Sequence, residues 1–390
     1  MDTRPKRIRN CRKVGRKVAL ALLASLSLAC SKTESSGTPS ASPTTSAAPA
    51  ASTSPVSKTA TPSASATVAA SAVPVTPKID APDCVAKTKG KQSSVGAVGG
   101  RVLGMAAAGG AVYVLRHEEA SARASVMKLP RQGGKPAKLG QHVDAGTPNS
   151  FIVTADAAFF TMRGNIIKIS LKEERVEKIA SDFPKAITSY AGHVYGVRCS
   201  KKKTYELVRV PEAGGDVAVV ASWDRGAVGK CKISSLAVNE QNAIVADWPG
   251  RRLFQISLAS GKATEVGNGY PFPDSVILHG DSFVFQSSKG VSRIPQTGGD
   301  AKLVTSIGTS PFHVITSDGV NLYIINEDAY GASGSIERVP LTGGTPEKLT
   351  AWQVRDDAMG GGIGTLAVDD QCFYFGKFQT NFTGISAKQK

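Results

Sequence analysis

The stretch Ile336-Glu-Arg-Val-Pro-Leu-Thr-Gly-Gly-Thr-Pro-Glu-Lys-Leu349 joins two short apolar runs through a Gly-Gly turn. Its first five residues follow a pattern: an aliphatic residue, any residue, a long polar residue, an aliphatic residue, then Pro or Ser. Successive copies of the pattern end 40, 41, 46, 38 and 45 residues apart. A nearly constant period indicates an array of similar structural units. The other five copies are Val126-Met-Lys-Leu-Pro130, Ile166-Ile-Lys-Ile-Ser170, Leu207-Val-Arg-Val-Pro211, Leu253-Phe-Gln-Ile-Ser257 and Val291-Ser-Arg-Ile-Pro295.

Each copy belongs to a longer unit of strand-like segments. Four copies continue into Gly-Gly, which favours a hairpin because glycine adopts positive φ at little steric cost. Two further strand candidates precede each copy, so each unit contains four short strands. The clearer of the two occurs seven times, at Val112-Tyr-Val114, Ala158-Phe-Phe160, Val194-Tyr-Gly-Val197, Ala243-Ile-Val245, Phe283-Val-Phe285, Leu322-Tyr-Ile-Ile325 and Cys372-Phe-Tyr-Phe375.

Four short strands in a period of about 42 residues are typical of a β-propeller blade. The alternation and the β-branched and aromatic content exclude helical repeats. Seven second strands predict an all-β, seven-bladed propeller, with six blades as the alternative. The seventh unit has only one further strand candidate, Thr383 to Ala387, which would leave an open edge. Residues Ser93 to Val102 precede the first blade's own strands and could supply the missing outer strand.

The repeat resembles the propeller repeats of bacterial exported lipoproteins, broadly TolB-like or NHL-like, over about residues 92 to 390. The resemblance implies the fold. It implies no functional residue, because the recurring positions are strand and turn positions.

The N-terminus has the order of an export signal. Residues 1–29 carry eight Lys and Arg, then the apolar run Val18 to Leu28, and end before Cys30. The run is shorter than the roughly 20 apolar residues of a membrane-spanning helix. The segment Leu26-Ser-Leu-Ala-Cys30 resembles a bacterial lipobox, although Ser27 stands where Leu is usual. The resemblance implies a diacylated Cys30 and sorting to the outer membrane, on its periplasmic face or at the cell surface. Cleavage without lipidation is the alternative.

The sequence predicts three regions: a signal peptide over 1–29, a tether over 30–81 and the propeller domain over 82–390. The tether consists mainly of Ser, Thr, Ala, Pro and Val, which cannot bury enough apolar surface to fold. The chain has a net charge of +16, which falls to +9 once residues 1–29 are removed. This charge is spread over a large domain without an arginine-rich helix or RNA-binding motif, so nucleic acid is not an expected partner.

Four cysteines, Cys84, Cys199, Cys231 and Cys372, remain besides Cys11 in the signal and Cys30. An even number in an exported protein predicts disulfides. The preferred pairing of the three that are possible joins Cys84 to Cys372 and Cys199 to Cys231. The first bond would tie the start of the domain to the last blade.

No catalytic residue, metal site or cofactor is predicted. The five histidines are scattered over different repeats, and no metal-ligand spacing, nucleophile elbow or phosphate-binding loop is present. The acidic pairs Glu327-Asp328 and Asp356-Asp357 lack the spacing of a calcium loop.

In a propeller, the loops between the second and third strands and those between blades open on one face, where ligands usually bind. All three tryptophans are predicted to lie in such loops, close to Asp or Arg. Exposed Trp and Arg are typical of binding surfaces, but the same rings could instead pack as structural plugs on the neighbouring blade. The candidate binding residues are Trp223, Arg225, Asp247, Trp248, Arg252, Tyr330, Trp352 and Arg355.

The sequence therefore favours a monomeric, non-enzymatic binding or scaffold lipoprotein. It would be attached to the membrane by its N-terminal lipid and would hold a protein or glycan of the cell envelope on its loop face. The alternative function is a lyase or hydrolase with its site in the central channel.

Overall fold

The structure, a computed structural model, describes residues 93–390 except 145, 184–185, 201–202, 227–232, 269, 271–272, 308–314, 328–332, 354–362, 380–381 and 390. The predicted signal peptide, Cys30, the tether and Cys84 lie outside the described residues. The described residues all belong to one compact unit. The described part of this unit contains no helix that is long and apolar enough to span a membrane.

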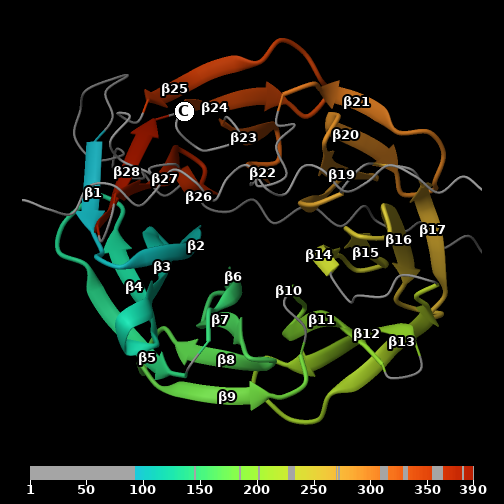
Figure 1. Cartoon of the computed structure of the whole chain (residues 1–390), viewed down its shortest axis with the longest axis horizontal. Coiled ribbons are helices and arrows are strands. Elements are labelled where there is room, and N and C mark those ends of the chain that lie inside the picture. Colours follow the sequence, from blue (N-terminus) through green and yellow to red (C-terminus); the bar gives the residue numbers. More distant parts are fainter. Residues whose placement is uncertain are drawn as a thin grey trace, which may run out of the picture. The chain divides into compact units, whose positions relative to one another are not determined.

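Seven four-stranded antiparallel sheets are arranged in a ring, one sheet per blade (Figure 1). The prediction of a seven-bladed propeller is confirmed, and the six-bladed alternative is wrong. Blade 1 contains β2 (Arg101–Ala108), β3 (Ala111–Glu118), β4 (Arg123–Pro130) and β5 (Ala137–Val143), with η1 (Glu119–Ser121) between β3 and β4. Blade 2 contains β6 (Asn149–Val153), β7 (Ala157–Met162), β8 (Asn165–Ser170) and β9 (Val176–Ala180). Blade 3 contains β10 (Ile187–Tyr190), β11 (His193–Cys199), β12 (Thr204–Pro211) and β13 (Ala218–Asp224).

The remaining blades follow the same order from the inner to the outer strand. Blade 4 contains β14 (Ile233–Val238), β15 (Asn242–Asp247), β16 (Arg252–Ser257) and β17 (Ala263–Asn268). Blade 5 contains β18 (Val276–His279), β19 (Ser282–Ser287), β20 (Gly290–Pro295) and β21 (Lys302–Thr305). Blade 6 contains β22 (Ile315–Ser317), β23 (Asn321–Glu327), β24 (Ser333–Pro340) and β25 (Glu347–Gln353).

Blade 7 is completed from both ends of the domain. Its strands β26 (Ile363–Val368), β27 (Cys372–Gln379) and β28 (Phe382–Gln389) are joined by the outer strand β1 (Ser93–Ala97). The expectation that the segment before blade 1 closes the ring is confirmed for residues 93–97, whereas Arg101 and Val102 belong to the inner strand of blade 1. The ring closes where β2 lies against β26 (Figure 1).

The hydrophobic core lies between the blades, because successive residues of a strand point to opposite faces of the sheet. In β3, Val112 and Val114 pack against blade 7, whereas Tyr113 and Leu115 pack against blade 2. Both faces of β3 are therefore buried, which explains its nearly continuous apolar sequence.

The long polar residue of the repeat is a structural feature of the third strand. In three blades it lies directly opposite a tyrosine of the second strand: Lys128 opposite Tyr113, Arg209 opposite Tyr195, and Arg338 opposite Tyr323. The Tyr323 hydroxyl donates to Asp318 at 2.9 Å. Burial, then the contact with Asp318, raises the pKa of Tyr323, so this side chain stays neutral. The repeat thus marks a strand position and not a ligand site.

Serine hydroxyls join the inner strands of neighbouring blades. Ser150 of β6 donates to the carbonyl of Ile187 in β10 and accepts from its N–H, at 3.2 and 3.1 Å. Ser235 of β14 accepts from the N–H of Val276 in β18 at 3.0 Å. These bonds satisfy backbone groups that the edge of each sheet would otherwise leave unpaired.

Replacing Ser235 by alanine should lower the free energy of unfolding by about 1–3 kcal/mol, because it leaves the buried N–H of Val276 without a partner. Urea denaturation measures the change. The control is Ser222→Ala on β13, where the side chain is exposed and a change within about 0.5 kcal/mol is expected. Equal effects for both variants would contradict a role for the inter-blade bond.

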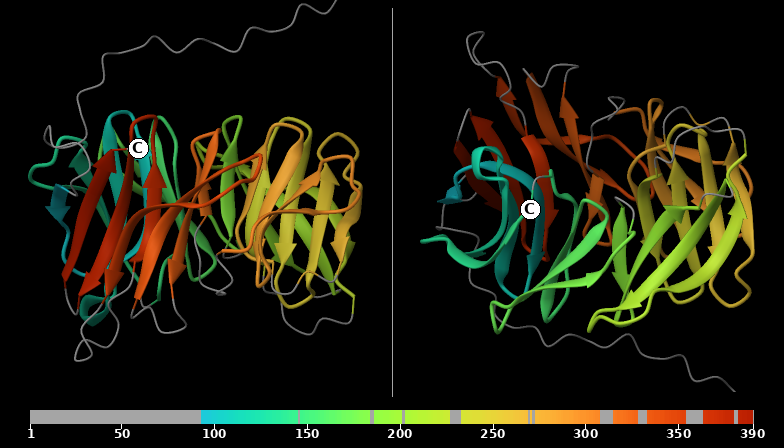
Figure 2. Two further views of the ribbon diagram at one scale, coloured as in Figure 1. Left: turned by 90° about the horizontal axis from the view of Figure 1, so that it is seen from above. Right: turned by 60° about the horizontal axis from the view of Figure 1, so that its bottom comes forward.

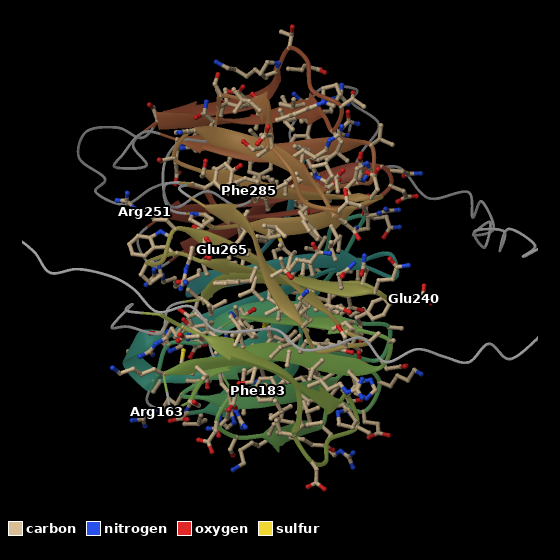
Figure 3. The ribbon with its side chains drawn as sticks, turned by 90° about the vertical axis from the view of Figure 1, so that its right-hand side faces the viewer. Arg163, Phe183, Glu240, Arg251, Glu265 and Phe285 are labelled. Atoms are coloured by element: carbon tan, nitrogen blue, oxygen red, sulfur yellow. The ribbon has the colours of Figure 1, made fainter. Side chains whose placement is uncertain are left out.

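The strands run between two faces of the ring (Figure 2). We call the face that carries the connections between second and third strands, and between blades, the loop face; the other is the turn face. Arg163 and Arg251, from second-to-third connections, lie on one side of the molecule, and Glu240 of a first-to-second turn lies on the other (Figure 3). The predicted Gly-Gly turns are confirmed as six-residue connections on the turn face: both glycines have positive φ, as at Gly343 (91°) and Gly344 (139°).

Candidate binding site on the loop face

Five of the eight predicted binding residues come together where blade 3 meets blade 4. Trp223 lies near the end of β13 and Arg225 follows it, while Asp247 and Arg252 flank the β15–β16 hairpin that carries Trp248. Of the other three, only Trp352 is described, and it lies elsewhere. Trp352 lies on β25 of blade 6, and Tyr330 and Arg355 lie outside the described residues.

A buried ion pair holds the hairpin of blade 4. Asp247 is fully buried, and its Oδ2 accepts from Arg252 Nη2 at 2.8 Å. Its Oδ1 accepts from the N–H of Gly250 at 3.1 Å. The same Arg252 Nη2 donates to the carbonyl oxygen of Arg225 at 2.8 Å. One guanidinium therefore fixes both the hairpin at residues 248–251 and the connection that leaves blade 3.

Three aromatic rings lie under this ion pair. The Trp223 ring lies 5.6 Å from that of Tyr205 and 5.8 Å from that of Phe254, between centroids. The Arg252 guanidinium lies 4.8 Å from the centre of the Phe254 ring, in a cation–π contact. Burial, then the charge of Asp247, raises the pKa of Tyr205, so its hydroxyl stays protonated beside that carboxylate.

The predicted loop positions of two tryptophans are wrong. Trp223 is in β13 and Trp352 is in β25; only Trp248 lies in a loop. Trp223 packs into the core between blades 3 and 4, and Trp352 into the core between blades 6 and 7. A side chain on Gly334 would overlap the Trp352 ring, so this glycine leaves room for it. These two rings therefore fit the interpretation as structural plugs that pack on a neighbouring blade, and not that of exposed binding residues.

Tyr205 and Phe254 are site residues that the sequence did not indicate. Phe254 belongs to a copy of the repeat, whereas Tyr205 precedes its copy by two residues and lies in β12. Their place in the site follows from cross-strand register, since Tyr205 pairs with both Cys199 and Trp223 across the sheet. The signal available in the sequence was the position of Tyr205 near the loop end of its strand.

Cys199 and Cys372 are both disulfide-bonded. Cys199 is the last residue of β11, and Cys372 is the fully buried first residue of β27. Their expected partners, Cys231 and Cys84, lie outside the described residues, so the pairing stays a prediction. Within the residues that the structure describes, no group of three or more His, Cys, Asp or Glu is placed to hold a metal ion.

A loop-face concavity lies on blade 2. Its volume is about 340 Å³, and Arg163 and Asn149 are among the lining residues. Arg163 pairs with Asp144 at 3.2 Å, but with a side chain that is 59% exposed. This exposed pair offers a natural comparison for the buried Asp247–Arg252 pair.

Replacing Asp247 by asparagine should lower the free energy of unfolding by about 2 kcal/mol, because the Arg252 charge, 17% exposed, loses its buried partner. Asp144→Asn should change it by less than about 1 kcal/mol, as is usual for exposed pairs. Chemical denaturation of both variants gives the two values. If they are equal, the buried pair is not what holds this hairpin.

No known protein family matches the chain, and no curated protein matches it in sequence. Solved structures match its fold. Streptogramin B lyase has a TM-score of 0.58 and 13% identity, over 77% of this chain and 98% of that chain. A computationally designed protein has a TM-score of 0.52 and 10% identity, over 76% and 98%.

The extracellular domain of a putative hybrid two component system from B. thetaiotaomicron has a TM-score of 0.54 and 10% identity, over 75% of this chain and 38% of that chain. Identities this low establish shared architecture and not shared activity. The chain is therefore a seven-bladed β-propeller of the kind seen in streptogramin B lyase.

Proposed function

We propose that this protein is an envelope-anchored binding or scaffold lipoprotein that holds a protein or glycan on the loop face where blades 3 and 4 meet. The observation that supports this most directly is the buried Asp247–Arg252 pair, which fixes the hairpin carrying Trp248 and Arg251. A recognition surface gains affinity when its loops are fixed in advance, because less conformational entropy is lost on binding.

The composition of the hairpin fits such a role. Trp and Arg are the residue types that most often dominate binding energy at interfaces. Trp248 is half-buried and Arg251 is exposed, and Figure 3 shows Arg251 on the opposite side from Glu240. A lipid on Cys30 followed by the tether would hold this surface near the membrane, with the chain as a monomer.

The test uses the full-length chain immobilised through its N-terminus. A panel of envelope glycans and detergent-solubilised envelope proteins is passed over it, and binding is measured by surface plasmon resonance. The double variant Trp248→Ala, Arg251→Ala should weaken binding of the captured ligand by at least about tenfold. Glu240→Ala, on the turn face, is the matched control and should leave binding unchanged.

Two results would overturn the proposal. One is a ligand that the double variant binds as tightly as the unaltered chain. The other is a chain that binds nothing in the panel but turns over a small molecule, which would favour a lyase or hydrolase.

A further inference from the structure

We infer that the blade 3–blade 4 site binds an oxyanion, a carboxylate or phosphate group on its ligand, through Arg225 and Arg252. This inference rests on the proposed loop-face binding function and names the chemistry of the ligand. It starts from hydrogen-bond donors that the fold leaves unused.

Three buried N–H groups of the cluster have no hydrogen-bond partner among the described residues: Trp223 Nε1, Arg225 Nε and Arg252 Nε. An unsatisfied buried donor costs about 1–3 kcal/mol, so most such donors in folded proteins are paired. The same cluster also holds the buried Tyr205 hydroxyl, which can donate or accept, so donors predominate in it and complement an acceptor. A group with two or three oxygens and no hydrogen is the acceptor that could pair with several of them.

The charge of the cluster is also unbalanced. The guanidiniums of Arg225 and Arg252 and the carboxylate of Asp247 all act electrostatically on the Tyr205 hydroxyl, so the three charges lie close together. Asp247 pairs with Arg252, whereas Nε of Arg225 has no hydrogen-bond partner among the described residues. Asp247 thus balances one of the two guanidiniums, and an anion on the ligand would pair with the other.

The second terminal nitrogen of Arg252 takes no part in the two hydrogen bonds that fix the hairpin and the blade 3 connection. Arg252 uses Nη2 for its bonds to Asp247 and Arg225, which leaves Nη1 without either bond. Nη1 faces Gly226, where an added Cβ would lie only 3.5 Å away. Gly226 has no side chain and a φ of 69°, which other residues rarely adopt, so no Cβ of this residue lies against Nη1.

A further basic residue is next to the site along the backbone. The N–H of Arg225 donates to the carbonyl oxygen of Lys203 at 3.0 Å, which brings the exposed Lys203 beside the site. The nearest carboxylate in the sequence is that of Asp224. Its Oδ1 accepts from the backbone N–H of Gly226 at 2.8 Å, and not from either guanidinium. A second cation strengthens the attraction for an anion and makes it sensitive to salt.

Isothermal titration calorimetry on the full-length chain tests the inference with four probes: glucuronate, glycerol phosphate, inorganic phosphate and neutral glucose. We expect at least one anion to bind and glucose not to bind. Arg225→Gln should weaken that binding by at least about tenfold, and Arg225→Lys by less, because the charge remains while the paired donors are lost. Tighter binding of glucuronate would identify a carboxylate as the ligand group, and tighter binding of the two phosphates would identify a phosphate.

The matched control is Arg163→Gln, which removes an exposed arginine of the same face on blade 2 and should leave binding unchanged. Binding of the anion should also quench tryptophan fluorescence, and this quenching should disappear in Trp223→Phe. Anion binding that is absent, or that Arg225→Gln retains, overturns the inference. The proposed function is tested separately. If the unaltered chain still binds an envelope ligand that the Trp248→Ala, Arg251→Ala variant loses, the proposed function stands and only the anion inference fails.

Discussion

Replacing Arg131 by methionine should lower the free energy of unfolding by about 3–5 kcal/mol, the typical result of removing one partner from a buried ion pair. Arg131 follows β4 in blade 1 and reaches Asp369 of blade 7, a residue 238 positions away in the sequence. The side chains of Arg131 and Asp369 are only 8% and 16% exposed, and their N···O distance is 2.5 Å. Urea denaturation provides the measurement.

A hydrogen-bond network around Arg131 and Asp369 explains why this pair should contribute more to the free energy of unfolding than the exposed ion pairs do. Arg131 Nε also donates to the Tyr374 hydroxyl at 3.1 Å, and that hydroxyl donates to Asp369 at 2.8 Å. The other Asp369 oxygen accepts from the N–H groups of Gln371 and Cys372. Removing Arg131 leaves a charged and largely buried carboxylate between the first and last blades, where the ring closes.

Asp370 provides the matched control, since it contacts the same guanidinium with a side chain that is 71% exposed. Asp370→Asn should change the free energy of unfolding by less than about 1 kcal/mol. Arg131→Met combined with Asp369→Asn should recover much of the loss, because no unpaired charge then remains. A single Arg131 variant as stable as the unaltered protein would contradict this account of ring closure.

The same pair predicts how stability changes in acid. Burial alone would raise the pKa of Asp369, but its bonds to Arg131, to two backbone N–H groups and to Tyr374 outweigh burial and hold the pKa below its usual range. A carboxyl with a lowered folded pKa stabilises the protein above its unfolded pKa of about 3.9, and that contribution is lost as the pH falls through the folded value. Stability should therefore fall below about pH 4, and less steeply in Arg131→Met. Thermal melting at pH 7 and at stepped pH values below 4 compares the two slopes.

Replacing Val95 by aspartate should lower the free energy of unfolding by about 3 kcal/mol or more, because it places a charge in an apolar core. Val95 is 1% exposed and packs among Tyr374, Ile385 and Leu129, in the core between blades 7 and 1. Its carbonyl oxygen accepts from the N–H of Gly134 at 3.2 Å, so β1 contacts blade 1 as well as β28. Losing β1 would also expose the edge of β28 to other chains.

Ser94→Asp adds the same charge one residue away, on an exposed side chain of the same strand, and should change stability little. Denaturant unfolding gives the free energies, and light scattering after mild heating reports aggregation. If both substitutions have the same effect, the contribution of β1 comes from backbone pairing alone and not from the buried valine.

The sequence determined the class of fold, the number of blades and the means of closing the ring. These depend on local regularities: alternation with a period of two residues, glycine turns after the third strand, and a constant spacing of the units. It also located Asp247, Trp248 and Arg252 as members of one site, because they lie within six residues of one another in a hairpin.

Only the tertiary structure decided which side chains are buried and which partners they have. Outer strands carry bulges: where β13 pairs with β12, Val220 of β13 is left without a partner between Ala221 and Val219. One extra residue reverses which face every following side chain occupies. Trp223 follows this bulge in β13, and the register there turns its ring into the core between blades 3 and 4. The Arg131–Asp369 pair and the unused donors of Arg225 and Arg252 arise only where separate blades meet, and local sequence cannot encode the distance between blades.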